Sequence, residues 1–306
     1  MVKGEKIMSA GVRYKLNRFD MIFTIFSYSF LMFCLLIVIY PLIYIVSSSF
    51  SSTDAVTSGR VWLLPVEPSL LGYKAVFKNS QILTGYANSL FYTVAGTVIN
   101  IVLTVMAGYP LSRRDFFGRG AIMAIFTFTM LFSGGMIPTY ILVQKLGMID
   151  SRWAMLIPQA LGVWNVIIAR TFFMSTIPDE LYEAAQLDGC SDIRFLLKIV
   201  LPLSTAILSV LALFYAVGNW NSYFNALLYL RDPDKFPLQI VLRNILILNK
   251  SKSEMLDNVD MMNQAKGLEE LLKYALIVVA SVPVLMIYPF VQKYFVKGIM
   301  IGSLKG

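Results

Sequence analysis

The sequence predicts an all-α polytopic membrane protein with six transmembrane helices. Three observations predict it: 57% of the 306 residues are hydrophobic, only 14% are charged, and six long windows contain no charged residue at all. Soluble globular domains carry about 25% charged residues. A helix needs about 20 mostly apolar residues to cross a bilayer, and it crosses with its backbone groups paired internally.

The six windows are the expected spans, and they comprise residues 21–53, 79–112, 120–144, 153–169, 199–230 and 274–292. The first is much longer than the apolar part of a signal peptide, so we expect a retained helix. The fourth is short but extends past Arg170 to Ile177, because an arginine can direct its charge to the membrane surface. The glycines of "FSGGMIPTY" (132–140) predict a break or bend in the third span.

These windows divide the chain into an N-terminal arm (1–20), a first transmembrane helix with an outer segment (21–78), a transmembrane domain (79–292) and a C-terminal tail (293–306). The arm, the short loop 112–120 and the tail are rich in lysine or arginine and fall on one side of a six-span chain. The positive-inside rule makes that side cytoplasmic, with both termini there. We therefore expect a multi-pass protein of the cell membrane, with outer segments at 48–78 and 231–273.

Several function classes are disfavoured by composition. The net charge of +8 fits cytoplasmic-loop anchoring better than nucleic-acid binding. The absence of histidine excludes histidine catalysis and histidine metal sites, and Cys34 and Cys190 fit free thiols. No G-x-x-x-x-G-K-[ST] phosphate loop occurs, so we expect no ATP site in this chain. The sequence also lacks an acid–base dyad, a metal cluster and a nucleophile constellation at the membrane surface, so we expect no metal site and no enzymatic activity.

One charged segment interrupts the apolar pattern, "EAAQLDGCSDIRFLLKIVLP" (183–202). Upstream, Thr176 can cap a helix, Pro178 suits its first positions, and the acidic residues after it complement the helix dipole. Leu181, Ala184, Ala185 and Asp188 then share one face at helical spacing. Gly189 predicts the stop of a short surface helix at 178–189, Ser191 can cap a second helix, and Pro202 can kink the following span. From local chemistry alone, an ordinary interfacial helix fits as well.

The spacing of this segment resembles the cytoplasmic "EAA" signature of the membrane subunits of binding-protein-dependent ABC importers. The signature is E-A-A, three residues, G, nine residues and I-x-L-P, and it is matched by Glu183-Ala184-Ala185, Gly189 and Ile199-Val200-Leu201-Pro202. The stretches "PVEPSLLGYKAVF" (65–77), "WNSYFNALLYL" (220–230) and "QKYFVKGIMIGSLKG" (292–306) are similar to sugar permeases. They are most like the maltose-type second permease subunit, in its branch for complex oligosaccharides and polysaccharide fragments.

The resemblance implies the type I ABC importer transmembrane (MetI-like) fold and a permease that translocates oligosaccharides. The implied partners are a second permease in a heterodimer, two copies of a cytoplasmic ATPase that uses ATP and Mg²⁺, and an extracytoplasmic solute-binding protein. In these importers the surface helix is the coupling helix, so the resemblance implies a coupling helix at 178–189. The implied ATPase-coupling residues are Glu183, Ala184, Ala185, Asp188, Gly189, Ile199, Leu201 and Pro202. Glu183 would pair with a basic residue of the ATPase, and the tail would reach the ATPase through Gly302, Ser303, Lys305 and Gly306.

Polar groups inside spans are costly and often mark a transport pathway. The substrate-pathway candidates are Trp164, Asn165, Asn219, Trp220, Asn221, Tyr223 and Asn225. Aromatic faces and amides suit a neutral oligosaccharide. The alternative is that the aromatic rings form an interfacial belt and the amides hold helices together. Likewise, "FPLQIVLRNILIL" (236–248) fits either a docking site for the binding protein or a helix that packs on the permease.

Two other transporter classes compete with this reading. A gradient-driven secondary transporter usually has ionisable residues within its spans, and the cores of these six windows have none. An ABC permease for amino acids or peptides would share the coupling segment, but the tail and outer segments favour sugars.

Overall fold

The computed structural model describes residues 18–253, 267–287 and 289, and all regular structure in these residues is helical. Three of the described helices are long and apolar enough to cross a membrane alone: α1 (Arg18–Ser49), α4 (Ser80–Ser112) and the helix Gly267–Ile287. Two bent pairs raise the number to five if each pair is one span. The fourth predicted window contains α8 (Val163–Thr176), which has only 14 residues, so the six-span count stays a prediction.

The first bent pair confirms the predicted break in the third span. α5 (Arg119–Leu131) and α6 (Met136–Lys145) meet at an angle of 113°. Gly135 stands between them at φ +87°, a backbone conformation that costs a residue with a side chain free energy but suits glycine. The turn sends α6 back toward α7 (Trp153–Leu156).

The second bent pair leads into the fifth predicted span. The helical run Asp192–Leu203 comprises α10 (Asp192–Phe195), a π-helical turn (Leu196–Val200) and α11 (Leu201–Leu203). It meets α12 (Thr205–Trp220) at 82°. The proline-containing α11 and the π-turn lie just before the bend, and both are common causes of kinks. The predicted kink near Pro202 is therefore present.

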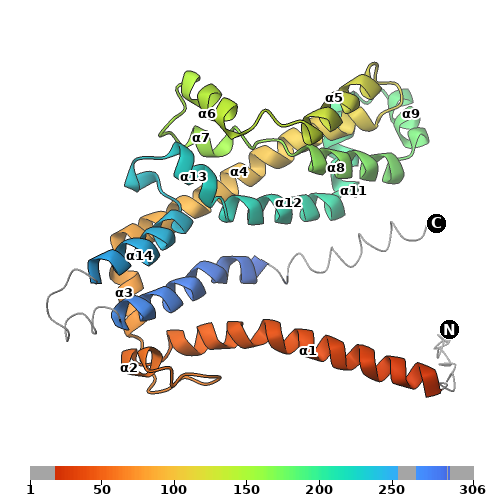
Figure 1. Cartoon of the computed structure of the whole chain (residues 1–306). Helices are drawn as coiled ribbons and strands as arrows, with labels where there is room; N and C mark the ends of the chain where they lie inside the picture. The colour runs from red at the N-terminus through yellow and green to blue at the C-terminus, as the bar shows by residue number, and fades with distance from the viewer. Residues whose placement is uncertain (1–17, 254–266, 288, 290–306) are drawn as a thin grey trace, which may run out of the picture.

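α4 is the central helix of the described chain. In Figure 1 it runs diagonally, with α8 and α12 along one half and α14 (Leu238–Ser253) along the other, and residue contacts join α4 to all three. One apolar cluster combines Val105 and Tyr109 of α4 with residues of α8 and α12. A second packs α14 against the helix Gly267–Ile287. A third places Tyr92 of α4 beside α7 and α13 (Tyr223–Tyr229).

Polar side chains on the inner face of α4 connect it to neighbouring elements. The Asn100 Nδ2 donates to the Gln159 carbonyl at 2.8 Å, and its Oδ1 accepts from Asn219 at 3.0 Å. The Thr104 and Tyr215 hydroxyls lie 2.6 Å apart and share a hydrogen bond. Such bonds join membrane helices because unpaired polar groups are costly in lipid.

α1 differs from every other long helix in its exposure. None of its most apolar stretch is buried within the chain. Only its C-terminal serines, Ser47, Ser48 and Ser49, are buried, against the outer segment. Figure 1 shows α1 lying beside the rest of the bundle and joined to it at one end.

The short elements gather at two opposite ends of the bundle (Figure 1). At one end lie α2 (Thr53–Thr57), α3 (Leu71–Lys78), α6, α7, α13, the 3-10 turn Pro233–Lys235 and α14. At the other lie α9 (Asp179–Leu187) and the Arg18 end of α1. The predicted coupling segment is thus far from both predicted outer segments.

Candidate functional site

The predicted coupling helix is present as α9, bounded by Asp179 and Leu187. Its N-cap is Pro178, in the extended conformation that proline and an N-cap both favour. Asp179 and Glu180 occupy the first turn as expected. The cap predicted for Thr176 is wrong, because this residue is the last of α8 and its buried hydroxyl has no hydrogen-bond partner.

Gly189 ends α9 as predicted, in a left-handed conformation at φ +73°. The Gly189 N–H donates to the Gln186 carbonyl, and the Cys190 N–H donates to the Ala185 carbonyl, both at 2.9 Å. This pair of bonds is a Schellman motif, in which one left-handed residue closes the helix and reverses the chain. Ser191 follows as the N-cap of α10, but its side chain makes no capping bond.

The face predicted for docking is divided in the structure. Ala185 is buried with Tyr182 in the apolar cluster formed by α4, α8 and α12. Glu183, Ala184 and Asp188 are exposed, and Leu187 is 90% exposed. Of the two alanines, only Ala184 presents its side chain to solvent, while Ala185 packs inside its own chain because it shares the Tyr182 side of the helix. No ion pair of Glu183 occurs within the described residues.

Tyr182 and Arg113 hold the inner side of α9. The Arg113 guanidinium lies over the Tyr182 ring, 3.7 Å from its centroid, and its Nη1 is 3.3 Å from the Asp179 Oδ1. The Tyr182 hydroxyl donates to the Asp192 Oδ1 at 2.6 Å and accepts from the Gln186 Nε2 at 2.6 Å. The hydrogen bond to the Asp192 carboxylate raises the pKa of Tyr182, so this phenol stays protonated at neutral pH.

The remaining residues of the predicted coupling set continue from this turn into the bundle. Ile199 and Leu201 are partly buried against the same apolar cluster, and Val200 between them is fully buried. Pro202 follows, two residues before the bend at Ser204. The signature residues from Glu183 to Pro202 therefore form one continuous path from an exposed helix to a bent span.

Two of the pathway candidates hold helices together. Asn219 lies partly buried between α12 and α4, with its amide bonded to Asn100. Trp220 is only 3% exposed, and its Nε1 donates to the Ala280 carbonyl at 3.1 Å. These contacts support the packing alternative for both residues.

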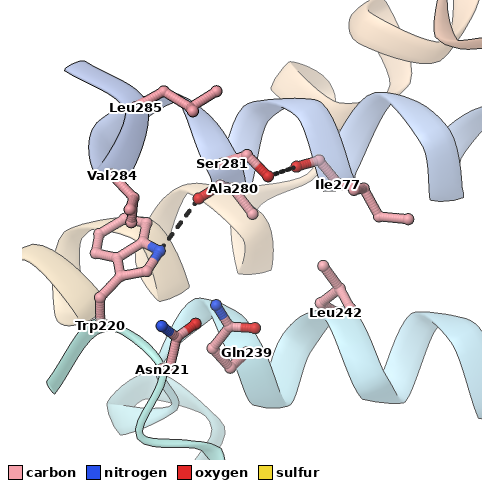
Figure 2. A pocket seen from close by; sticks show the side chains of 9 residues that line it. All are labelled: Trp220, Asn221, Gln239, Leu242, Ile277, Ala280, Ser281, Val284 and Leu285. Carbon is pink, nitrogen blue, oxygen red and sulfur yellow. Dashed lines mark hydrogen bonds between the residues drawn. The ribbon is translucent and has the colours of Figure 1, made fainter. Parts of the chain in front are cut away.

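Asn221 instead lines a cavity of about 460 Å³ between α14, the end of α12 and the helix Gly267–Ile287. Figure 2 shows the Asn221 and Gln239 side chains pointing toward this space, with the Trp220 ring at one end of it. Most of the wall is aliphatic, as with Leu242, and it contains no charged side chain. The Gln239 amide makes no hydrogen bond to another described residue, whereas the Asn221 Nδ2 donates to the Val217 carbonyl at 2.9 Å. The cavity therefore offers the Gln239 amide and the Asn221 amide oxygen in an apolar setting.

The other four pathway candidates do not converge on this cavity. Trp164 is exposed on α8, while Asn165, Tyr223 and Asn225 are half-buried. Tyr223 packs in the cluster with Tyr92. The structure therefore does not gather the seven candidates into one site.

The amphipathic segment 236–248 forms most of α14, and its described side chains favour the packing alternative. Leu238, Ile240, Val241 and Ile245 are buried, and the Leu238 N–H donates to the Ser89 hydroxyl of α4 at 2.8 Å. Before α14, the Asp150 Oδ1 accepts from the Arg231 and Asp232 backbone N–H groups, each at 3.0 Å. These bonds lower the pKa of Asp150 and fix the loop that enters α14.

Three residues of the site have no signal in the sequence, and four predicted tail contacts are not described by the structure. Arg113, Tyr182 and Gln239 carry no spacing signal; the structure stacks Arg113 on Tyr182 at the inner side of α9 and places Gln239 at the cavity. The expected ATPase contacts Gly302, Ser303, Lys305 and Gly306 lie outside the described residues.

Comparisons with known proteins identify relatives along almost the whole chain. The polygalacturonan/rhamnogalacturonan transport system permease protein YtcP of Bacillus subtilis (strain 168) is 42% identical over 285 residues, which cover 93% of this chain and 99% of that protein. Protein LplC of the same organism is 43% identical over 270 residues, covering 88% and 90% of the two chains. No protein-family model matches the sequence.

A solved structure agrees with these relatives. A chain in the crystal structure of a bacterial ABC transporter involved in the import of the acidic polysaccharide alginate is 37% identical, with a TM-score of 0.83 over 91% of this chain and 98% of that one. Identity at this level over nearly full length shows common descent as well as a common fold. The chain belongs to the family of sugar and oligosaccharide ABC transport system permeases.

Proposed function

We propose that this permease forms one half of the translocation path of an ATP-driven importer for oligosaccharides, which receives its substrate from an extracytoplasmic binding protein. The observation that carries the proposal is the construction of α9. Its Glu183 and Ala184 are exposed, while the Schellman turn at Gly189 connects it to Pro202 and the bent fifth span.

In this proposal, α9 docks in a cleft of a separate cytoplasmic ATPase. ATP with Mg²⁺ would bind to the ATPase and not to this chain. Closure of two ATPase copies would push α9, and the Gly189 turn would pass that displacement to α10 and α12. The permease would then alternate between outward-open and inward-open states as packed units that move together.

The proposed topology has six crossings with both termini cytoplasmic. The alternation of chain direction in Figure 1 supports it: α9 and the Arg18 end of α1 lie opposite α3 and α14. α8 spans about 21 Å at 1.5 Å per residue, less than the roughly 30 Å hydrocarbon layer. We expect residues 153–162, which include α7, to complete that crossing.

The proposed partners are a second permease, two ATPase copies and the binding protein. The bare surface of α1 needs lipid or another apolar surface around it, which suits a subunit of a membrane complex. We also expect the tail residues Gly302–Gly306 to touch the ATPases, so deletion of 302–306 should weaken stimulation of ATP hydrolysis.

The substrate class proposed is oligosaccharide, with acidic ones as the first to test. One relative is named for polygalacturonan and rhamnogalacturonan, and the similar solved transporter is involved in the import of alginate. Asn221, at the cavity of Figure 2, is the pathway candidate whose surroundings best suit hydroxyl groups of a sugar, because its amide oxygen can accept a hydrogen bond and the neighbouring Gln239 amide can both donate and accept.

The test is purification of the chain in mild detergent, followed by identification of co-purifying subunits and uptake assays in proteoliposomes. We expect an ATPase and a second permease, and ATP-dependent uptake of oligogalacturonides or alginate oligomers in the presence of the binding protein. Recovery of a stable chain alone, with uptake driven by an ion gradient, would overturn the proposal.

Two variants test the role of α9 in the same assay. Glu183→Lys reverses the exposed charge, and Gly189→Val places a branched side chain at φ +73°, where it costs roughly 1–2 kcal/mol or more. Both should abolish uptake while the chain remains in the membrane. Asp54→Lys makes the same charge reversal on the exposed surface of α2 and serves as the control. Normal uptake by both α9 variants would refute the coupling assignment.

A further inference from the structure

α9 needs an anchor that its own sequence does not supply. It has nine residues, and isolated helices of this length are not stable in water. Its buried face consists of only Tyr182 and Ala185. A cavity of about 250 Å³ also lies beside its first turn, lined by side chains that include Tyr109, Arg113 and Asp179. Apolar packing therefore secures the start of α9 poorly.

Arg113, the first residue after α4, anchors the start of α9 through three contacts. Its guanidinium covers the Tyr182 ring at 3.7 Å, its Nη1 pairs with Asp179 at 3.3 Å, and its Nε lies 3.4 Å from the Asp115 Oδ1. The Nε makes no hydrogen bond, so the contact with Asp115 is electrostatic only. The Arg113 side chain is 13% exposed, which limits solvent screening of these interactions.

The Tyr182 ring extends this connection to the next helix. One face lies against Arg113, the ring packs edge-on against Phe195 at 5.2 Å between centroids, and the hydroxyl donates to Asp192. Asp192 and Phe195 both belong to α10. Arg113 and Tyr182 together therefore join the end of α4 to the two helices on either side of the Gly189 turn.

We propose that Arg113 is the positioning residue that fixes the coupling helix α9 to the end of α4, so that a displacement of α9 moves α4 as well as α12. This inference rests on the proposed docking of α9 on an ATPase. It adds a second route into the bundle, beside the one through Gly189 and Pro202. α4 is well placed to distribute the movement, because it contacts α8, α12 and α14.

The proposal depends on arginine chemistry. A guanidinium is planar, so it stacks on an aromatic ring while its edge pairs with a carboxylate. A lysine ammonium supplies charge at one point and cannot occupy both positions. Arg113→Lys should therefore weaken the connection between α9 and α4 almost as much as Arg113→Gln does, although lysine keeps the charge.

Arg114 provides a matched control on the adjacent position. Its Nε also lies 3.3 Å from an Asp179 oxygen, but its side chain is 81% exposed and it makes no cation–π contact with an aromatic ring of the described residues. Exposed ion pairs contribute little because solvent screens them. Arg114→Gln should leave the connection intact.

The first experiment measures coupling in the purified importer, as ATP hydrolysed per oligogalacturonide imported into proteoliposomes. Arg113→Gln should raise this ratio roughly tenfold, the size expected when a half-buried cation–π contact and its ion pair are lost together. Arg113→Lys should raise it nearly as much, and Arg114→Gln should leave it within about twofold. A wild-type ratio in both Arg113 variants would overturn the proposal.

The second experiment needs no substrate and thus separates this inference from the proposed function. Spin labels at Phe117→Cys and Ile193→Cys, positions that are 98% and 72% exposed, report the distance between the loop after α4 and α10 in a background with Cys34 and Cys190 replaced by serine. Arg113→Gln should broaden a narrow distance distribution, and Arg114→Gln should not. An unchanged distribution in Arg113→Gln would overturn the positioning role even where uptake falls.

Discussion

α1 and α4 are nearly identical in length and both are long and apolar enough to cross a membrane, yet they differ in how much of their surface is buried within the chain. α1 has 32 residues and α4 has 33. None of the most apolar stretch of α1 is buried in the chain, whereas 33% of the corresponding stretch of α4 is buried. The difference lies in polar side chains at helical spacing: Asn88, Tyr92, Asn100 and Thr104 of α4 all bond to other elements.

The comparison teaches that apolarity does not identify the inside of a membrane protein. Lipid is as apolar as a leucine side chain, so an outward face and a packed face can have the same hydropathy. A stripe of small and polar residues does identify the packed face. Four substitutions test this difference, beginning with the largest expected effect.

Asn100→Leu should be the most damaging of the four. It leaves the Gln159 carbonyl without its partner and the Asn219 amide with only a long 3.5 Å bond to Thr97, so we expect a loss of about 2–3 kcal/mol in the free energy of unfolding. The measurement is the thermal unfolding of the purified protein in lipid nanodiscs. Val98→Leu, on the exposed side of the same helix, is the control. Equal melting temperatures for the two variants would contradict the role of the polar stripe.

Gly96→Ala should cost about 1–2 kcal/mol by overpacking. A Cβ atom at Gly96 would lie 2.7 Å from the Asn219 Nδ2, and moving that amide breaks its bond to Asn100. The same substitution should become nearly neutral in an Asn219→Ala background, which removes the obstacle. Additive losses in the double variant would show that close helix approach at Gly96 is not the reason for the effect.

Thr104→Val should cost about 1 kcal/mol, because it replaces a buried hydroxyl bonded to Tyr215 with a methyl group of similar volume. Thr127→Val on α5 is the matched control, since the Thr127 hydroxyl is exposed and bonds only to Met123 in its own helix. The two variants should differ clearly in melting temperature. A larger fall in melting temperature for Thr127→Val than for Thr104→Val would contradict this explanation.

Ile37→Ala on α1 should change the unfolding free energy of the isolated chain by less than about 0.5 kcal/mol. The Ile37 side chain is 56% exposed and belongs to none of the five apolar clusters of the described residues, so no packed cavity forms when it is shortened. Thermal unfolding in nanodiscs measures this as well. A loss above about 1 kcal/mol would mean that α1 packs on the bundle, and the comparison with α4 would fail.

The sequence predicted those parts of the fold that depend on local chemistry. The bounds of α9, the left-handed stop at Gly189, the bend after Ser133 and the kink near Pro202 all follow from single residues with restricted backbone preferences. The Thr176 prediction failed because α8 continues through that residue, so tertiary packing of α8 took precedence over a capping preference.

The candidate site was harder to predict, because its geometry depends on contacts between distant residues. Asn219 and Asn221 are two positions apart and identical in type, yet one joins α12 to α4 and the other lines the cavity. Arg113 and Tyr182 are 69 positions apart (182 minus 113), and nothing in the pattern of either segment indicates that they stack. Periodicity also failed to divide Ala184 from Ala185, since neighbouring positions on a helix differ by only about 100°.

The exposure of α1 has a consequence for biosynthesis. A helix whose backbone groups are paired internally, and whose apolar stretch is not buried against the rest of the chain, is stable in the bilayer by itself. α1 can therefore enter the membrane during translation and wait there as an independent unit. α4 cannot, because Asn88, Asn100 and Thr104 find their partners on segments that the ribosome makes later. The bundle therefore cannot assemble until the ribosome has made the residues around Asp234. Until then α4 lacks these partners, and a translocase or chaperone can bind it.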